Sequence, residues 1–123
     1  MLTKLIKFNM NNCLFCKIVS EVIPCNKVYE NDHVLAFDDI EPQAPVHVLI
    51  IPKKHITSIN DLNESDKNIC SEMFFVAQKI AALKNIDDSG FRCVINTNNN
   101  GGQTVFHIHM HVLGGRKLTW PPG

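Results

Sequence analysis

The sequence predicts an α+β fold, because short strand-like runs outnumber helical ones and follow one another in hairpin-like order. The strongest strand signal is residues 46–51, an apolar, β-branched run that Pro52 closes. One later segment instead repeats apolar residues at helical spacing. Together these observations predict a mostly antiparallel five-stranded sheet with one long helix on a face and one short helix.

The short helix and a hairpin are expected in the first third of the chain. Residues 15–20 form the expected helix, which has to stop before Pro24. Residues 28–29 and 34–37 are short strands around a turn at residues 31–32. The run 46–51 then forms the central strand.

The long helix is expected to begin at Asn63, which can cap it, with Asp66 three residues later. Apolar residues then recur at spacings of four and three and form one stripe: Ile69, Met73, Val76, Ile80 and Leu83. A break at residues 88–90 precedes a strand over residues 91–95. A polar, glycine-ending loop over 96–102 and a long last strand over 105–113 complete the domain.

Composition describes one globular domain. A chain of 123 residues buries roughly two-thirds of its unfolded surface, so its core needs no disulfide or metal cross-links to be stable. The zero net charge argues against a nucleic-acid partner, and no apolar run is long enough to span a membrane. Residues 1–12 lack the apolar core and the cleavage site of a secretory signal, so we interpret them as an extension of the domain. We expect this extension to be a flexible N-terminal arm. Residues 13–123 are then the single domain.

Five cysteines, an odd number, lie at positions 13, 16, 25, 70 and 93. Without a secretory signal a disulfide framework is not expected, and a reducing compartment fits better. We therefore expect the protein in the cytoplasm, with the nucleus as a second location. Cys13 and Cys16 have the spacing of a metal-binding or redox pair.

Three of the six histidines alternate along the last strand as His107, His109 and His111. Side chains alternate faces on a strand, and neighbours on one face lie about 6.6 Å apart, so the three imidazoles should share a face. Ile108, Met110 and Val112 should then face the core. Such a row suits a reaction centre or a zinc site better than a plain polar surface.

The run from residue 101 to 113, Gly-Gly-Gln-Thr-Val-Phe-His-Ile-His-Met-His-Val-Leu, resembles the histidine-triad pattern. Collinear matches occur at residues 35–40, 42–45 and 47–55, at Asn96, at residues 114–116 and at Trp-Pro-Pro-Gly 120–123. The resemblance covers about residues 13–123 and is strongest to the nucleoside-phosphoramidase branch of the family, also called protein kinase C inhibitor-like, which carries that ending. It implies the histidine-triad fold and a hydrolase that cleaves the phosphorus–nitrogen bond of purine nucleoside 5′-phosphoramidates.

The resemblance assigns catalytic roles. His109 would attack the α-phosphorus and form a nucleotidyl-histidine intermediate, while His47 would orient the other nitrogen of His109. His107 completes the triad. His111 and the loop amides would bind and stabilise the phosphate oxygens, the amides being those of Gly102, Gln103 and Thr104. Thr104 stands where the branch commonly has serine, so a hydroxyl is kept.

The resemblance also outlines a nucleotide site. Asp39 matches the residue that binds the ribose hydroxyls, and Asn96 would hold the phosphate or leaving-group side. The walls around the base would be Phe15, Ile18, Phe37, Ile40 and Leu49. By sequence alone, each of these apolar residues suits an ordinary core position equally well.

A metal site is the second implication. Some histidine-triad proteins bind one structural zinc through four residues that match Cys13, Cys16, His55 and His107 here, a complete tetrahedral set. The alternative is two buried thiols and two unliganded imidazoles, since the phosphoramidase branch often lacks the cysteines. No organic cofactor is expected.

Other functions remain open at this stage. The chain could be a dinucleoside polyphosphate hydrolase or nucleotidyl transferase, or a regulatory module that binds a purine nucleoside monophosphate with little turnover. A zinc hydrolase built on the three histidines lacks a nearby carboxylate as base. The resemblance further implies a homodimer whose sheets join, with Trp120 near the neighbour's site.

Overall fold

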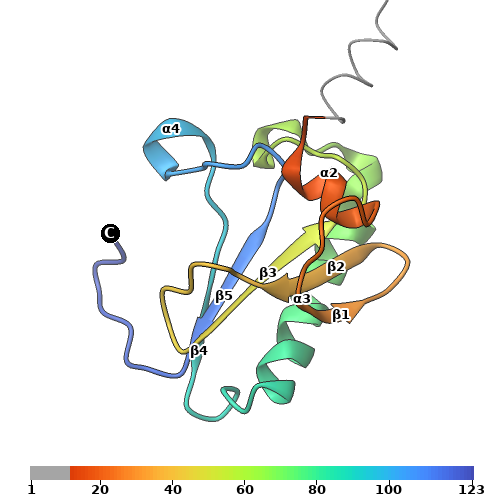
Figure 1. Ribbon diagram of the computed structural model, residues 1–123. Coiled ribbons are helices and arrows are strands. Elements are labelled where there is room, and N and C mark those ends of the chain that lie inside the picture. Colours follow the sequence, from red (N-terminus) through yellow and green to blue (C-terminus); the bar gives the residue numbers. More distant parts are fainter. Residues whose placement is uncertain (1–11) are drawn as a thin grey trace, which may run out of the picture.

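The computed structural model describes residues 12–123, so residues 1–11 of the expected N-terminal arm lie outside the described part. Five strands form one antiparallel sheet in the order β1-β2-β3-β5-β4 (Figure 1). Their bounds are β1 Lys27–Glu30, β2 Val34–Asp38, β3 Val46–Pro52, β4 Phe91–Val94 and β5 Met110–Gly114. The predicted α+β fold with a five-stranded antiparallel sheet is confirmed.

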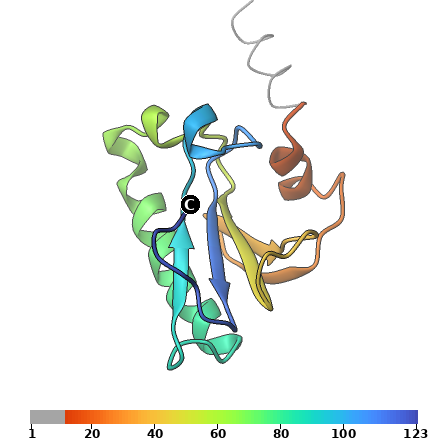
Figure 2. The ribbon, with the colours of Figure 1, turned by 90° about the vertical axis from the view of Figure 1, so that its left-hand side faces the viewer.

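Helices cover both faces of this sheet. The long helix α3 (Lys67–Leu83) packs on one face, and the short helix α2 (Leu14–Val19) lies on the opposite side (Figure 2). A single turn, α4 (Asn98–Gly101), and two 3-10 turns, η1 (Ile59–Asp61) and η2 (Glu64–Asp66), complete the order. Among the described residues, no helix has both the length and the apolar character to cross a membrane.

The strand β3 shows why both faces are needed. Val48 and Ile50 belong to the core under α3, whereas Leu49 and Ile51 belong to the core under α2. All four are buried. A strand covered on both faces reads as a continuous apolar run, which is how residues 46–51 predicted a central strand.

The long helix begins with the expected capping box, in which the Asn63 amide donates to the Asp66 carboxylate at 3.1 Å. The box caps the 3-10 turn η2, which leads directly into α3. Met73, Val76 and Ile80 of the predicted stripe are buried in the core, as expected. Leu83 is a correction, because it ends the helix and is 61% exposed, while Ile86 fills the core there.

The last strand is shorter than predicted, since β5 begins at Met110 and residues 105–109 lie outside the sheet. Its neighbour β3 ends at Pro52, which has no N–H to donate to a longer ladder. The Pro52 carbonyl accepts instead from the His107 side chain at 2.8 Å. His107 and His109 therefore precede the strand that carries His111.

Candidate functional site

A cavity of about 530 Å³ lies under α2 on the face opposite α3. Its apolar side includes the predicted walls Phe15, Ile18, Phe37 and Leu49. Ile40 also borders it, but at 92% exposed it stands at the rim and not in a wall. The polar end holds Asp39, His47, Thr104, His109 and His111.

His109 is held in one tautomer by a backbone group. Its Nδ1 lies 2.8 Å from the His107 carbonyl, and a carbonyl can only accept, so Nδ1 carries the proton. Burial lowers the pKa of His109 below its usual 6.5, although the bond to the His107 carbonyl opposes the shift. His109 is therefore a neutral imidazole at pH 7, with an unprotonated Nε2 available as nucleophile or base.

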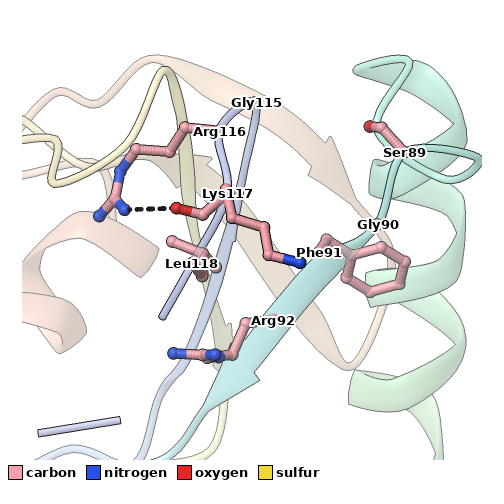
Figure 3. Close-up of a pocket in the computed structure, with 8 residues that line it drawn as sticks. All are labelled: Ser89, Gly90, Phe91, Arg92, Gly115, Arg116, Lys117 and Leu118. Carbon is pink, nitrogen blue, oxygen red and sulfur yellow. Dashed lines mark hydrogen bonds between the residues drawn. The ribbon is translucent and has the colours of Figure 1, made fainter. Parts of the chain in front are cut away.

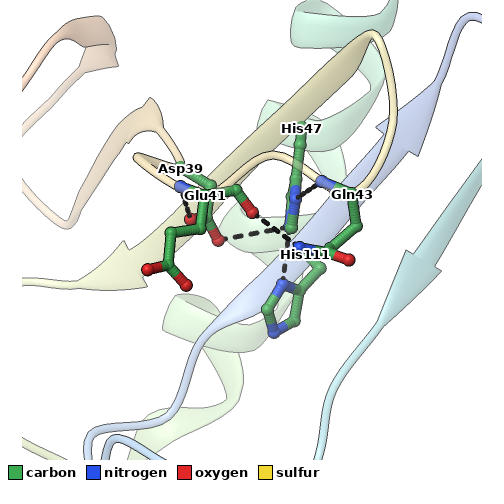
Figure 4. A network of polar contacts seen from close by, with 5 residues as sticks. All are labelled: Asp39, Glu41, Gln43, His47 and His111. Atoms are coloured by element: carbon green, nitrogen blue, oxygen red, sulfur yellow. Dashed lines mark hydrogen bonds and ion pairs between the residues drawn. The ribbon is translucent and has the colours of Figure 1, made fainter.

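The hydrogen bonds of His47 lead to His111, whereas a role in orienting His109 was expected. The Gln43 amide donates to His47 Nδ1 at 3.0 Å, so the ring proton sits on Nε2 (Figure 4). That Nε2 lies 2.8 Å from His111 Nδ1 and 3.4 Å from an Asp39 carboxylate oxygen. His47 consequently donates to His111, and orientation of His109 belongs to the His107 carbonyl.

His111 is the next member of this chain of hydrogen bonds. Burial and the neighbouring rings of His109 and His47 lower the pKa of His111 to about 4, so it is neutral at pH 7. Because His111 Nδ1 accepts from His47, its proton lies on Nε2. His111 can therefore present an N–H donor to an oxygen atom in the cavity, beside the His109 ring, whose centroid lies 5.0 Å away.

The glycine-rich loop differs from expectation in two of its three amides. The Gly102 and Gln103 amides donate to the Asn99 and Asn98 carbonyls at 3.0 and 3.1 Å, closing α4 as a helix C-terminus does. Gly102 takes the left-handed conformation there, with φ +83°. Among residues 12–123, only the Thr104 amide of the three donates to no other group.

The Gln103 side chain braces the loop from inside. Its oxygen accepts from the Asn98 amide at 2.9 Å, and its nitrogen donates to the Thr57 and Val105 carbonyls at 2.8 and 3.1 Å. Neither Gln103 nor Asn96 lines the cavity. The buried Gln103 side chain thus has a structural role, whereas a phosphate contact through the Gln103 amide was expected.

Asp39 lies half-buried at the cavity, next to the Glu41 amide and the His47 ring. One carboxylate oxygen accepts from the Glu41 amide at 2.9 Å, and the other is the oxygen 3.4 Å from His47 Nε2 (Figure 4). A carboxylate has about four acceptor sites, so sites remain for hydroxyl groups of a ligand. This position suits the expected contact with a ribose.

A second cluster, of two thiols and two imidazoles, could hold a metal ion, and it unites Cys13, Cys16, His55 and His107. Each sulfur–nitrogen contact measured is 3.3 to 3.6 Å, and the two Nδ1 atoms are 3.2 Å apart. In a tetrahedral zinc site with ordinary bond lengths, sulfur and nitrogen ligand atoms would lie about 3.6 Å apart and two nitrogen ligand atoms about 3.3 Å apart. The His107 Nε2–H bond to Pro52 leaves Nδ1 free as a ligand, the usual support of a metal-bound histidine.

Sequence reasoning missed part of the cavity wall. Ile23, Pro24 and Cys25 line it because the chain returns past the cavity after α2, and no local pattern marks them. A separate hollow of about 510 Å³ at the other end of β5 contains none of the predicted site residues (Figure 3). Its Arg92 and Arg116 donate to backbone carbonyls of the C-terminal tail and of Gln43.

Comparisons with known proteins agree with these features. The profile of the HIT domain matches residues 20–118. The chain is 49% identical over 105 residues to the purine nucleoside phosphoramidase of Escherichia coli K12, covering 85% of this chain and 88% of the relative. It is 53% identical to a solved HIT family hydrolase of Legionella pneumophila, with a TM-score of 0.89 over 91% of this chain and all of the other. A histidine triad protein of Clostridium difficile follows at 47% identity and a TM-score of 0.85, covering 88% and 94%.

Proposed function

The chain belongs to the HIT family, in which its relatives include hydrolases, and we propose that it hydrolyses the phosphorus–nitrogen bond of purine nucleoside 5′-phosphoramidates. The observation that carries this proposal is the tautomer of His109. A neutral imidazole with its lone pair on Nε2, beside a neutral N–H donor on His111, suits attack on a phosphorus centre.

In the proposed reaction His109 Nε2 bonds to the α-phosphorus and the bond from phosphorus to the amine breaks. The amine leaves with a proton taken from solvent, and the His109 ring becomes a cation that the His107 carbonyl stabilises. Water then attacks the phosphorus, breaks the bond to Nε2 and returns a proton to solvent. The products are a nucleoside monophosphate and a free amine.

Other cavity groups would bind the rest of the substrate. The His111 Nε2–H, the Thr104 amide and the Thr104 hydroxyl are the donors offered to the phosphate oxygens. Asp39 would accept from the ribose hydroxyls, and the apolar walls around Phe37 and Leu49 would enclose the base. The Escherichia coli relative is a purine nucleoside phosphoramidase, which supports a purine base here.

The deciding experiment measures turnover of adenosine 5′-phosphoramidate and compares it with turnover of diadenosine polyphosphates, the substrates of the alternative function. His109→Ala should lower kcat by at least about a hundred-fold, the scale of a lost catalytic group, while AMP still binds. His33→Ala is the matched control, because His33 is exposed and lies outside the cavity. Retention of more than a tenth of the activity by His109→Ala would contradict the assignment.

For the cluster, we propose zinc as the ion. Two thiolates and two imidazoles form a donor set that zinc prefers, and a closed four-ligand site is structural. The ion would tie α2 to the segment before β5. Elemental analysis of protein purified without added metal should find about one zinc per chain, and a content near zero would exclude it.

We also propose that two copies join through β4, an edge strand that pairs only with β5 among the described strands. Phe91 and Cys93 on that edge are exposed, and an open edge with apolar side chains favours pairing with another strand. Light scattering should find a dimer in solution, and Phe91→Lys should shift it toward monomer. A wild-type monomer at micromolar concentration would refute this.

A further inference from the structure

The metal-binding cluster and the His109 ring are joined by two direct connections. His107 contributes its imidazole to the cluster and its backbone carbonyl to His109 Nδ1, at 2.8 Å. Phe15 lies in α2 between Cys13 and Cys16, and its ring stands edge-on to His109, with centroids 5.0 Å apart at 87°. Both connecting residues are buried, His107 completely.

The first connection controls where the His109 proton sits. A neutral imidazole has two tautomers, and only the one with a proton on Nδ1 leaves Nε2 free for attack. The His107 carbonyl selects this tautomer only while it stays within hydrogen-bond distance. The position of that carbonyl therefore determines whether the reacting nitrogen is available.

Sheet pairing does not hold this carbonyl in place, since His107 precedes β5. Its side chain is held instead at both nitrogens, by the Pro52 carbonyl at Nε2 and by the cluster at Nδ1. The neighbouring Ile108 amide adds a single bond to the Ile56 carbonyl. Of these restraints, the cluster is the one that a bound ion would strengthen.

The second connection restrains the rotation of the His109 ring. Phe15 packs edge-on against both His109 and His107, the latter at 5.8 Å. Because its neighbours Cys13 and Cys16 are cluster residues, an ion there would anchor the first turn of α2 and hence the Phe15 ring. Aromatic edge-to-face pairs of this kind favour one relative orientation.

We propose that the cluster positions the catalytic nucleophile: with a metal ion bound, it holds the His107 carbonyl and the Phe15 ring so that His109 keeps its proton on Nδ1 and its Nε2 toward the substrate. His107 and Phe15 are thus positioning residues. The inference rests on the proposed function for the reaction that His109 performs, but the state of its ring can be measured without substrate.

The first experiment records the ¹⁵N ring signals of the histidines in the full chain, loaded with zinc and after removal by a chelator. The loaded protein should show His109 as a single Nδ1–H tautomer, and the metal-free protein should show an averaged signal. His33 serves as internal control and should not change. An identical His109 signal in both samples, with the amide spectrum of the sheet intact, would overturn the proposal.

If the metal-free chain unfolds, a variant that keeps the metal site still tests the proposal. Phe15→Leu keeps all four cluster residues, so its zinc content should match the wild type, while its His109 signal becomes averaged and kcat falls by about tenfold or more. Phe37→Leu is the matched control. Phe37 lines the same cavity and contacts the Phe15 ring at 5.7 Å, but no contact of its ring with His109 is found among the described residues.

Phe37→Leu should raise KM and leave the His109 signal unchanged. Equal behaviour of the two variants, or an unaltered His109 signal in Phe15→Leu, would overturn the role of Phe15. If the wild type does not hydrolyse phosphoramidates but its His109 signal responds to metal, the proposed function fails and the coupling stands. If hydrolysis is found and the signal does not respond, only the coupling fails.

Discussion

Replacing Asp39 with asparagine should remove the ability of the enzyme to distinguish ribo from 2′-deoxy substrates. Asparagine can still accept from the Glu41 amide, as Asp39 does at 2.9 Å, so the local turn is kept. It replaces one carboxylate oxygen by an N–H₂ group, which cannot accept a ribose hydroxyl. The same group faces His47, whose Nε2 lies 3.4 Å from Asp39, so overall activity should fall for both substrates.

The size of the discrimination follows from the position of Asp39. A hydrogen bond to a charged acceptor contributes about 1.5–3 kcal/mol, and the Asp39 side chain is 18% exposed, which favours the lower half of that range. About 1.5–2 kcal/mol corresponds to a ratio of roughly 10–30 in kcat/KM between ribo and deoxy substrates. In Asp39→Asn the ratio should drop to about 1–3, because the loss through His47 affects both substrates equally and cancels.

The assay compares kcat/KM for adenosine and 2′-deoxyadenosine 5′-phosphoramidates in three proteins. Asp32→Asn is the matched control and should leave the ratio unchanged, since Asp32 is exposed and lies outside the cavity. Equal rates for the two substrates in the wild type would show that Asp39 does not bind the ribose. A ratio that survives in Asp39→Asn would place the contact elsewhere.

Three further predictions concern stability. Gln103→Leu should lower the free energy of unfolding by about 2–4 kcal/mol in urea titrations, because three backbone groups lose their partner; a loss under 1 kcal/mol would contradict the bracing role. Ile80→Ala should cost about 2–5 kcal/mol and Leu83→Lys less than about 0.5 kcal/mol, since the first is buried and the second exposed. In the folded state the pKa of His111 falls to about 4, so the unfolded chain binds a proton at His111 at a higher pH than the folded chain does. The free energy of unfolding therefore decreases as pH falls from about 6.5 toward 4. His111→Gln should lose about 1–2 kcal/mol less than the wild type between pH 7 and pH 5, and parallel curves for the two proteins would argue against the shift.

Local patterns in the sequence were sufficient for most of the fold. The apolar run at 46–51 predicts a central strand, and the Asn63 capping box with its following stripe predicts the long helix. These signals work because strand alternation, helical periodicity and caps depend on residues within a few positions of one another. The same locality explains the error at Leu83, since the spacing cannot tell where the sheet beneath the helix ends.

The chemistry-bearing residues were also visible in the sequence, through the alternating histidines and the motif they resemble. Their hydrogen-bond partners were not. Whether His109 is oriented by His47 or by the His107 carbonyl depends on where β5 begins, and this depends on Pro52 at the end of a different strand. The amides of Gly102 and Gln103 looked free in the sequence and are used by a helical turn in the structure.

The sequence by itself determined which side chains are available: five histidines, a carboxylate and a pair of thiols at spacings that suit a reaction centre and a metal site. Only the tertiary structure decided how they are used. Cys13 and His107 are 94 positions apart, yet their ligand atoms lie 3.3 Å from each other, and the tautomers of His47, His109 and His111 follow from contacts made between separate elements. The physical reason is that a proton's place on an imidazole depends on which donor or acceptor folding brings within about 3 Å, and short-range sequence patterns carry no information about that.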